Sequence, residues 1–271
     1  MKQMRMHVVL NKTVGQTPLQ AIERWKTENP LYKDIAACYA GRLDPMASGK
    51  LLVLLGDECK RQERYHGLDK EYEIEVLLDI KTDTGDILGM PNYNGTESRP
   101  GTREIRRALG VEQGSKHVVY PAYSSKTVNG KPLFMYALEG TLDSIEIPTH
   151  TETIYHINLL RQEQMPAAEL HARIRSSLQD IPRSQDASKA LGADFRQDAV
   201  RGAWEELFST LPERSFAVLS LRVTCGTGTY MRTLAERLGD AHGTTALALS
   251  IRRTRIGTYW PPGIWVRDFS R

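Results

Sequence analysis

The stretch CYAGRLDPMASGKLLVLLG, residues 38–56, places an Asp-Pro step between two glycines and follows it with the apolar run Leu51–Leu55. Glycines permit a tight loop, and the apolar run can anchor the end of that loop in a hydrophobic core. We therefore expect Asp44 to stand on a supported loop. The same residues also fit an ordinary Asp-Pro turn with no chemical role, because both residue types are common in turns.

A second signal lies at residues 216–239. The segment FAVLSLRVT predicts a strand that leads through the glycine turn CGTG into a helix from about Tyr230 to Leu238. If Thr229 caps this helix, Arg232 falls in the first turn, where the helix dipole disfavours a cation by about 0.3–1 kcal/mol. A negative partner should compensate, either Glu236 at i+4 or a buried carboxylate or RNA phosphate.

The segment EYEIEVLL at 71–78 alternates charged and apolar residues, which is the period of a half-buried strand. Tyr72 then shares a face with Ile74 and Val76, as a core residue or as a side chain free to stack on a ligand. Two helices are also expected, at 17–29 with Thr17 as cap and at 102–109 with Gly110 behind it. Because strands and helices alternate without a βαβ rhythm, the predicted class is α+β.

Residues from about 156 to 214 have mostly helical propensity with polar breaks, so we expect a helical insertion there. The chain has 271 residues, of which 40% are hydrophobic, and this is enough for a core of normal size. Its three cysteines and seven histidines have no metal-ligand spacing, so a metal site is not expected. No apolar run of about 18 residues predicts a membrane span, and the short polar start is no secretory signal.

Five blocks occur in an order and spacing that resemble the TruB family of tRNA pseudouridine synthases: GRLDPMASGKLLVLLG, DKEYEIEVLLDIKTDTGDILG, YPAYSSKTVNGK, CGTGTYMRTLAERLG and IRRTRIG. One such block is a weak signal, but five in order are specific. The resemblance covers roughly residues 8–150 and 216–258. It implies the pseudouridine synthase fold, with a mixed central sheet, helices packed on it and a central catalytic cleft.

Carried over residue by residue, the resemblance implies catalytic roles for Asp44 as the carboxylate, Tyr72 as the base-stacking ring and Arg232 as the partner of Asp44. Substrate-binding positions follow from the family motifs and from nearby positive charge: Tyr39, Arg42, Lys60, Tyr230, Ile251, Arg106, Arg107 and Lys126. Further basic residues beside the motifs are either a solvated surface or phosphate contacts: Arg61, Arg64, Arg103, Lys131, Arg252, Arg253 and Arg255.

Pseudouridine formation breaks the bond from C1′ to N1, turns the uracil and joins C1′ to C5, so the enzyme needs a carboxylate beside the sugar and base. No cofactor or metal is implied. The arginine would keep the buried carboxylate ionised. Because the target atoms are hidden in folded RNA, the base must be flipped out at a cost of a few kcal/mol, which stacking on Tyr72 can offset in part.

The sequence departs from the family at the catalytic loop. The family's GHTG reads CYAG here, so Tyr39 stands in place of the histidine that helps flip the base, and Arg42 replaces a small residue. The chain also ends about a dozen residues after Gly257, so no C-terminal PUA domain is expected. The resemblance implies a cytoplasmic, monomeric enzyme acting on the T-loop uridine at tRNA position 55. The alternative is an RNA-binding or tRNA-folding protein with weak or no catalysis.

Overall fold

The computed structural model describes residues 5–179, 181 and 196–270. Its strands are β1 (His7–Lys12), β2 (Ala37–Tyr39), β3 (Ser48–Leu55), β4 (Asp69–Leu78), β5 (Ile80–Thr82), β6 (Pro91–Tyr93), β7 (Gly114–Val119), β8 (Thr127–Val128), β9 (Lys131–Pro132), β10 (Thr149–Pro166), β11 (Ser215–Cys225), β12 (Ala246–Trp260) and β13 (Ile264–Asp268). Its helices are α1 (Pro18–Glu28), α2 (Thr102–Glu112), α3 (Leu133–Glu139), α4 (Ala167–Gln179), α6 (Gln197–Thr210) and α7 (Met231–Ala241), with 3₁₀ segments η1 (Pro30–Tyr32), η2 (Gly56–Tyr65) and η3 (Leu142–Ser144).

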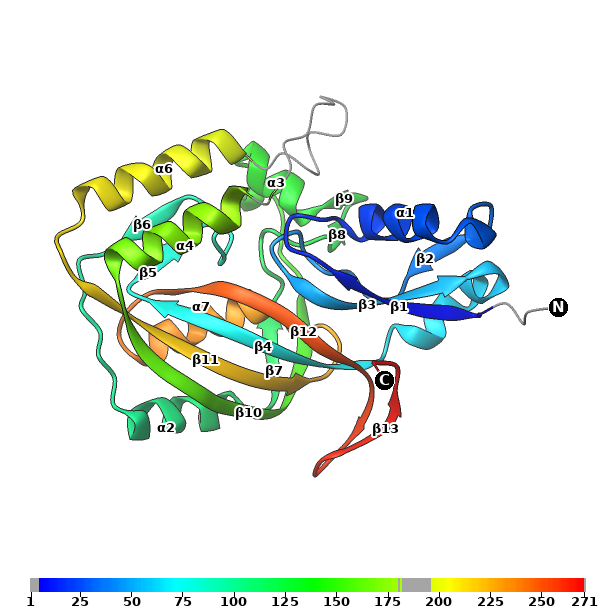
Figure 1. Cartoon of the computed structure of the whole chain (residues 1–271). Coiled ribbons are helices and arrows are strands. Elements are labelled where there is room, and N and C mark those ends of the chain that lie inside the picture. The colour runs from blue at the N-terminus through cyan, green and yellow to red at the C-terminus, as the bar shows by residue number, and fades with distance from the viewer. Residues whose placement is uncertain (1–4, 180, 182–195, 271) are drawn as a thin grey trace.

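A nine-stranded sheet in the order β1-β3-β12-β4-β11-β10-β7 runs through the molecule, with β2 added to β3 and β13 added to β12 (Figure 1). Its strand pairs are antiparallel except for β12 and β3, which are parallel where Arg253 faces Gly49. The sheet is therefore mixed, and the predicted α+β class is confirmed. The strands predicted at 71–78 and 216–224 are β4 and β11, two neighbours near its centre.

Helix α1 begins where its sequence predicts. The Thr17 hydroxyl accepts a hydrogen bond from the backbone N–H of Gln20, and the Gln20 side chain accepts one from the N–H of Thr17. This capping box satisfies two N–H groups that the first turn leaves unpaired, while Pro18 occupies a position that needs no N–H. The helix ends at Glu28, before Asn29 and Pro30.

Helix α2 is longer than predicted, because Gly110 lies inside it and the helix continues to Glu112. The extra turn is held by Glu112, which is buried and pairs with Lys116 at 2.6 Å and with Arg237 of α7 at 2.8 Å. These pairings are tertiary, so the local glycine signal could not reveal them.

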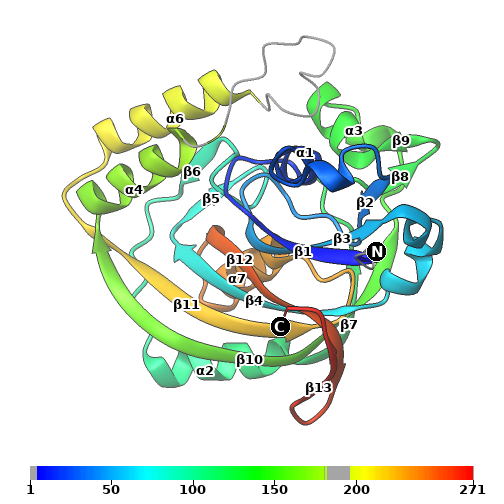
Figure 2. The same ribbon diagram turned by 45° about the vertical axis from the view of Figure 1, so that its right-hand side comes forward.

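The predicted helical insertion at 156–214 is wrong at its start, because residues 156–166 belong to the long strand β10. This part of β10 pairs with β11 as far as Pro166, and its exposed face carries the polar residues that obscured the strand pattern. The helices α4 and α6 follow and lie side by side along the sheet, with α2 on its other side (Figures 1 and 2). Residues 182–195 of the expected insertion lie outside the described residues.

The helices α4 and α6 are part of the main hydrophobic core. Leu170, Ile174, Val200 and Trp204 are all at most 1% exposed and belong to the same cluster as the strands β4 and β11. Two smaller clusters lie around β1, β2 and β3. Leu43, Met46 and Ala47, in the loop that joins β2 to β3, belong to the main core.

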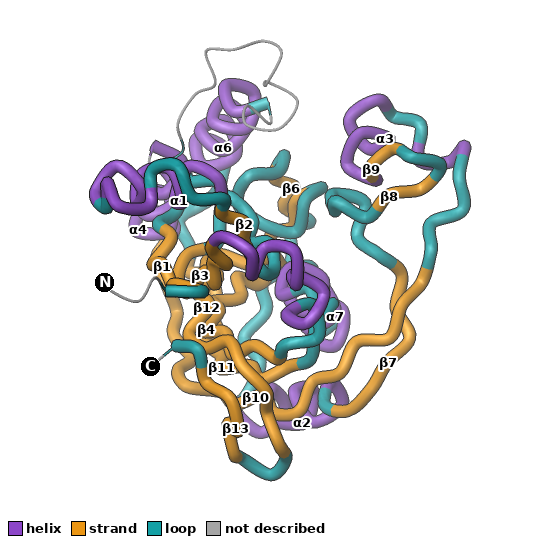
Figure 3. The backbone as a smooth tube through the Cα atoms, turned by 90° about the vertical axis from the view of Figure 1, so that its right-hand side faces the viewer, coloured by secondary structure: helices purple, strands orange, loops and turns teal. Residues whose placement is uncertain are grey.

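The short β8–β9 hairpin and α3 stand to one side of the central sheet (Figure 3). Within the described part of the chain, no helix has both the length and the apolar character needed to cross a membrane.

Candidate active site

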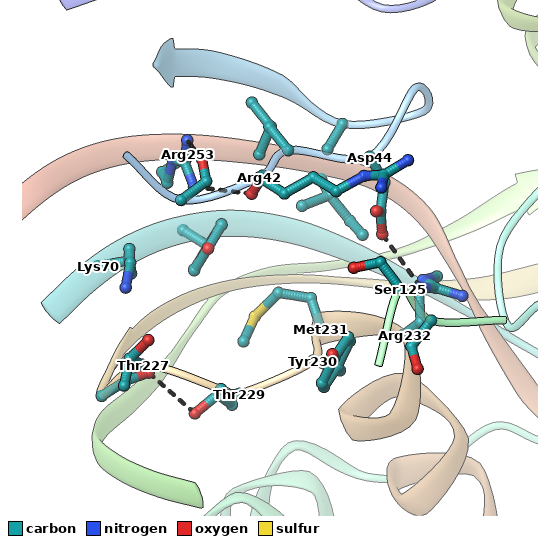
Figure 4. Close-up of a pocket in the computed structure, with 18 residues that line it drawn as sticks. Arg42, Asp44, Lys70, Ser125, Thr227, Thr229, Tyr230, Met231, Arg232 and Arg253 are labelled. Atoms are coloured by element: carbon teal, nitrogen blue, oxygen red, sulfur yellow. Dashed lines mark hydrogen bonds and ion pairs between the residues drawn. The ribbon is translucent and has the colours of Figure 1, made fainter. Parts of the chain in front are cut away.

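A pocket of about 220 Å³ opens where four parts of the fold meet (Figure 4). Its walls come from the β2–β3 loop at residues 41–47, the strands β4 and β12, residues 124–125 before β8, and residues 226–232, which form the β11–α7 turn and the start of α7. These segments correspond to the motifs singled out in the sequence. The fold therefore brings them together around one cavity.

Asp44 and Arg232 form an ion pair in this pocket, with Nη2 of Arg232 3.1 Å from Oδ2 of Asp44. The arginine side chain is 6% exposed, whereas the aspartate side chain is 40% exposed. The predicted counter-charge of Arg232 is thus confirmed as a carboxylate from another loop. The alternative partner, Glu236, makes no ion pair with Arg232 in the described structure.

Arg232 is held on three further sides. Its Nη1 donates to the carbonyl of Thr84 at 2.8 Å, its Nη2 donates to the carbonyl of Tyr123 at 3.0 Å, and its Nε lies 3.8 Å from Oδ2 of Asp86. Burial raises the pKa of Asp86, and the positive charge of Arg232 opposes that rise. The guanidinium is therefore fixed in direction before any substrate arrives.

Asp86 was missed at the sequence level, although it lies in the quoted motif TDTGD. The sequence signal that could have found Asp86 is the glycine directly before it, Gly85. In the structure this glycine has a φ of +75°. A Cβ at Gly85 would lie 3.1 Å from Cβ of Arg232 and 2.7 Å from Oε1 of Glu236. Only glycine fits this turn against the helix.

The cap of α7 differs from the prediction, because the N-cap residue is Tyr230 and not Thr229. The Thr229 hydroxyl instead donates to the carbonyl of Gly226 at 3.2 Å and closes the glycine turn. Arg232 remains in the first turn of the helix, and Tyr230 lines the pocket, as expected of a substrate-binding residue.

Tyr72 and Ile251 line the pocket from adjacent strands, as predicted. Tyr72 of β4 faces Arg253 of β12, and Ile74 faces Ile251. Burial raises the pKa of Tyr72, so its phenol stays neutral at ordinary pH. A neutral ring against an apolar side chain suits a stacked base.

Arg253 corrects an expectation, because it is 1% exposed and cannot be a surface phosphate contact. Its guanidinium donates to the carbonyls of Lys50 at 2.7 Å, Arg42 at 3.3 Å and Gly41 at 3.4 Å. It therefore fixes the backbone of the loop that carries Asp44. The close packing of β3 on β12 that permits this requires Gly49, where a Cβ would lie 2.2 Å from the carbonyl oxygen of Arg253.

The remaining predicted substrate-binding residues do not all reach the pocket. Arg42 lines it, whereas Tyr39 lies outside the lining and packs against the cluster around Ile22 and Leu51, and its role in base flipping stays a prediction. Lys60 lies in η2 with Nζ 2.7 Å from Asp57. Three others lie outside the lining: Arg106 and Arg107 on the exposed side of α2, and Lys126, whose Nζ is 5.2 Å from the ring centre of Tyr120.

The family model of the N-terminal domain of the TruB family pseudouridylate synthases matches residues 31–179. Two similar curated proteins are both named tRNA pseudouridine synthase B. The one from Bordetella avium is 28% identical over 93% of this chain and 81% of its own length, and the one from Aromatoleum aromaticum is 30% identical over 93% of this chain and 63% of its own length. The sheet is mixed, and a carboxylate and an arginine are paired in its pocket. Together with these matches, this arrangement defines the class of the protein as an RNA-modifying synthase. The chain belongs to the TruB family of pseudouridylate synthases.

Among solved structures, the Cbf5 complex with Nop10 and Gar1 superimposes with a TM-score of 0.54. The match covers 93% of this chain and 48% of that one, at 18% sequence identity, and it shows the shared fold. The predicted pseudouridine synthase fold is confirmed.

Proposed function

We propose that the protein converts uridine to pseudouridine in tRNA, at the T-loop uridine of position 55, with Asp44 as the catalytic carboxylate. The observation that carries this proposal is the pair of Asp44 and Arg232 in a pocket of about 220 Å³. Enzymes that act on a base in folded nucleic acid flip it out into a pocket of this kind. The names of the two curated relatives support tRNA as the substrate.

Asp44 is suited to act on the substrate because only one of its oxygens is engaged. Oδ2 faces Arg232, whereas Oδ1 has no hydrogen-bond partner among the described residues. The ion pair with Arg232 holds the carboxylate in place, and Asp44 lines the pocket. The reaction needs such a group beside C1′ and the base, because the C1′–N1 bond breaks and a C1′–C5 bond replaces it.

Entry of the base is assisted by stacking. Tyr72 and Ile251 present apolar surface from β4 and β12, and a stacked base recovers roughly 1–3 kcal/mol of the cost of flipping. Outside the pocket, several predicted basic residues have no carboxylate partner in the described structure: Arg64, Arg103, Arg106, Arg107 and Lys126. These are suited to contact RNA phosphates, with affinity that falls as salt rises.

Release of tritium from tRNA labelled at C5 of uridine tests the proposal. The wild-type protein should release label from a transcript with uridine at position 55 and none when cytidine replaces it there. A transcript that binds without releasing label would favour the alternative, an RNA-binding or tRNA-folding protein, because folding help needs no loss of the C5 proton. A cytoplasmic location and a monomeric state stay predictions, tested by fractionation and by light scattering.

A further inference from the structure

Lys70 occupies the end of the pocket opposite the Asp44–Arg232 pair (Figure 4). It precedes Tyr72 by two residues on β4, so both side chains project from the same face of the strand. Lys70 is 7% exposed, and its Nζ donates to the backbone carbonyl of Leu68. The structure therefore buries an ammonium group beside the ring on which the target base would stack.

This lysine lacks the partners that a buried cation normally has. No carboxylate lies within ion-pair distance of Lys70 in the described structure, and the nearby charge of Arg253 repels it. Lys12 offers a comparison, since it is also buried but donates to three carbonyls, those of Thr13, Gln16 and Pro45. An ammonium group has three donors, so Lys70 keeps donors available to a ligand.

The walls around Lys70 favour a base over a phosphodiester as that ligand. Leu43, Ala47, Met231 and Ile251 are buried apolar residues of the same lining. A phosphate beside Lys70 would lose its water without a second cation at that end of the pocket. The guanidinium of Arg253 is engaged by carbonyls, Arg232 is paired with Asp44, and the side chain of Arg42 extends towards Asp44 (Figure 4). A uracil ring is apolar on its faces and carries two carbonyl oxygens on its edge, each of which needs a donor.

We propose that Lys70 donates a hydrogen bond to a carbonyl oxygen of the flipped uracil and stabilises the negative charge that the ring carries during the reaction. The inference rests on the proposed function. When the C1′–N1 bond breaks, its electron pair stays on the ring, and the charge spreads over N1 and the two carbonyl oxygens. The electron-deficient C1′ is taken up by the Asp44 carboxylate, as an ester or as an ion pair. C5 then bonds to C1′ and releases the carboxylate, the C5 proton leaves to solvent, and N1 takes up one proton from solvent. A fixed cation at one oxygen stabilises this stage more than the neutral substrate.

The first test is Lys70→Met, measured by single-turnover tritium release from C5-labelled tRNA. We expect the rate to fall by about 100-fold or more, with tRNA affinity within about threefold of wild type. The matched control is Lys81→Met, which removes an exposed lysine of β5 and should retain the wild-type rate. Lys70→Met should fold, because methionine fills a similar volume without a buried charge, and its melting temperature checks this.

The second test uses pH. Burial, with Arg253 adding to it, lowers the pKa of Lys70 to about 8, and Asp69 and Cys225 are the groups near it that oppose the shift. The wild-type rate should decline as the pH rises through about 8, because the lysine then loses its proton. Lys70→Arg keeps its charge at that pH. Its lower rate should therefore show no such decline.

Three results would overturn the assignment. One is a Lys70→Met rate within about twofold of wild type while Asp44→Asn is inactive. Another is a loss confined to tRNA affinity, which would make Lys70 a phosphate contact. The third is an identical alkaline decline in wild type and Lys70→Arg. If the wild type itself releases no tritium, the proposed function fails instead, so the two failures are distinguishable.

Discussion

Arg232 joins two carboxylates that come from different loops. Its Nη2 lies 3.1 Å from Asp44 in the β2–β3 loop, and its Nε lies 3.8 Å from Asp86, which is buried beyond β5. The first carboxylate faces the pocket and the second is 4% exposed. The buried Asp86 therefore helps to fix the position of Arg232, and Arg232 in turn fixes the position of Asp44, the residue proposed to react.

Arg232→Met should abolish activity, lowering the single-turnover rate by at least about 100-fold, because Asp44 loses both its counter-charge and its orientation. It should also lower the melting temperature, since Asp86 is left buried without its cation. Arg232→Lys keeps a charge but not the geometry of the fork, and we expect it to be slow as well. Arg222→Met, at an exposed pair with Glu73, is the control for charge loss. Near wild-type turnover by the methionine variant would make the ion pair unimportant.

Tyr39→Ala should destabilise the protein by about 1–3 kcal/mol without changing the chemical rate, because the ring packs on the cluster beneath α1. Tyr39→Phe should be close to neutral, since the described structure shows no hydrogen bond to the hydroxyl. Melting temperatures and single-turnover rates of both variants decide the point. A stable alanine variant that reacts 10 to 100 times more slowly, roughly the value of one lost stacking contact, would support the base-flipping role of Tyr39.

Trp204→Ala should cost about 3–5 kcal/mol of stability. The indole is 1% exposed in the main core, and its Nε1 donates to the carbonyl of Ile87 at 3.0 Å. Trp260→Ala is the matched control, because that side chain is 65% exposed and should change stability by no more than about 0.5 kcal/mol. Equal melting temperatures for the two variants would mean that α6 is not an integral part of the core.

The buried Lys70 should make stability depend on alkaline pH. Its folded pKa is about 8 and its usual value is 10.5. Between these values the unfolded chain binds the proton that the folded chain has lost, so the free energy of unfolding rises with pH. Measured against Lys70→Met by urea denaturation, wild type should gain roughly 1–2 kcal/mol between about pH 7.5 and about pH 9.5. A constant difference between the two proteins would show that Lys70 has an ordinary pKa.

Helix caps and the spacing of apolar residues correctly predicted those helices and strands whose limits depend on neighbouring residues. Thr17 and Pro18 predicted the start of α1, and the alternation after Tyr72 predicted β4, because capping and side-chain periodicity depend on neighbouring residues alone. The end of α2 and the length of β10 were misjudged. They depend on Arg237 of α7 and on pairing with β11, contacts that only the assembled fold supplies.

The site shows the same division. The pairing of Asp44 with Arg232 followed from the family resemblance, because the position of Arg232 in the first turn of α7 left Glu236 as an equal local alternative. Asp86, Arg253 and Lys70 were not recognised as parts of the site, because their importance lies in burial and in partners far away in sequence. In a strand that alternates charged and apolar residues, the sequence alone predicts that each charged residue lies on the surface. Only the assembled pocket shows that some of these residues are buried.

The central claim is that Asp44 carries out the isomerisation of a uridine in tRNA. Its most direct test is tritium release from C5-labelled tRNA by wild type and Asp44→Asn, with tRNA binding measured in parallel. The amide keeps the size of the side chain and removes its charge, so we expect full release by wild type, none by the variant, and affinities within about threefold of each other. Release by Asp44→Asn at the wild-type rate would contradict the account.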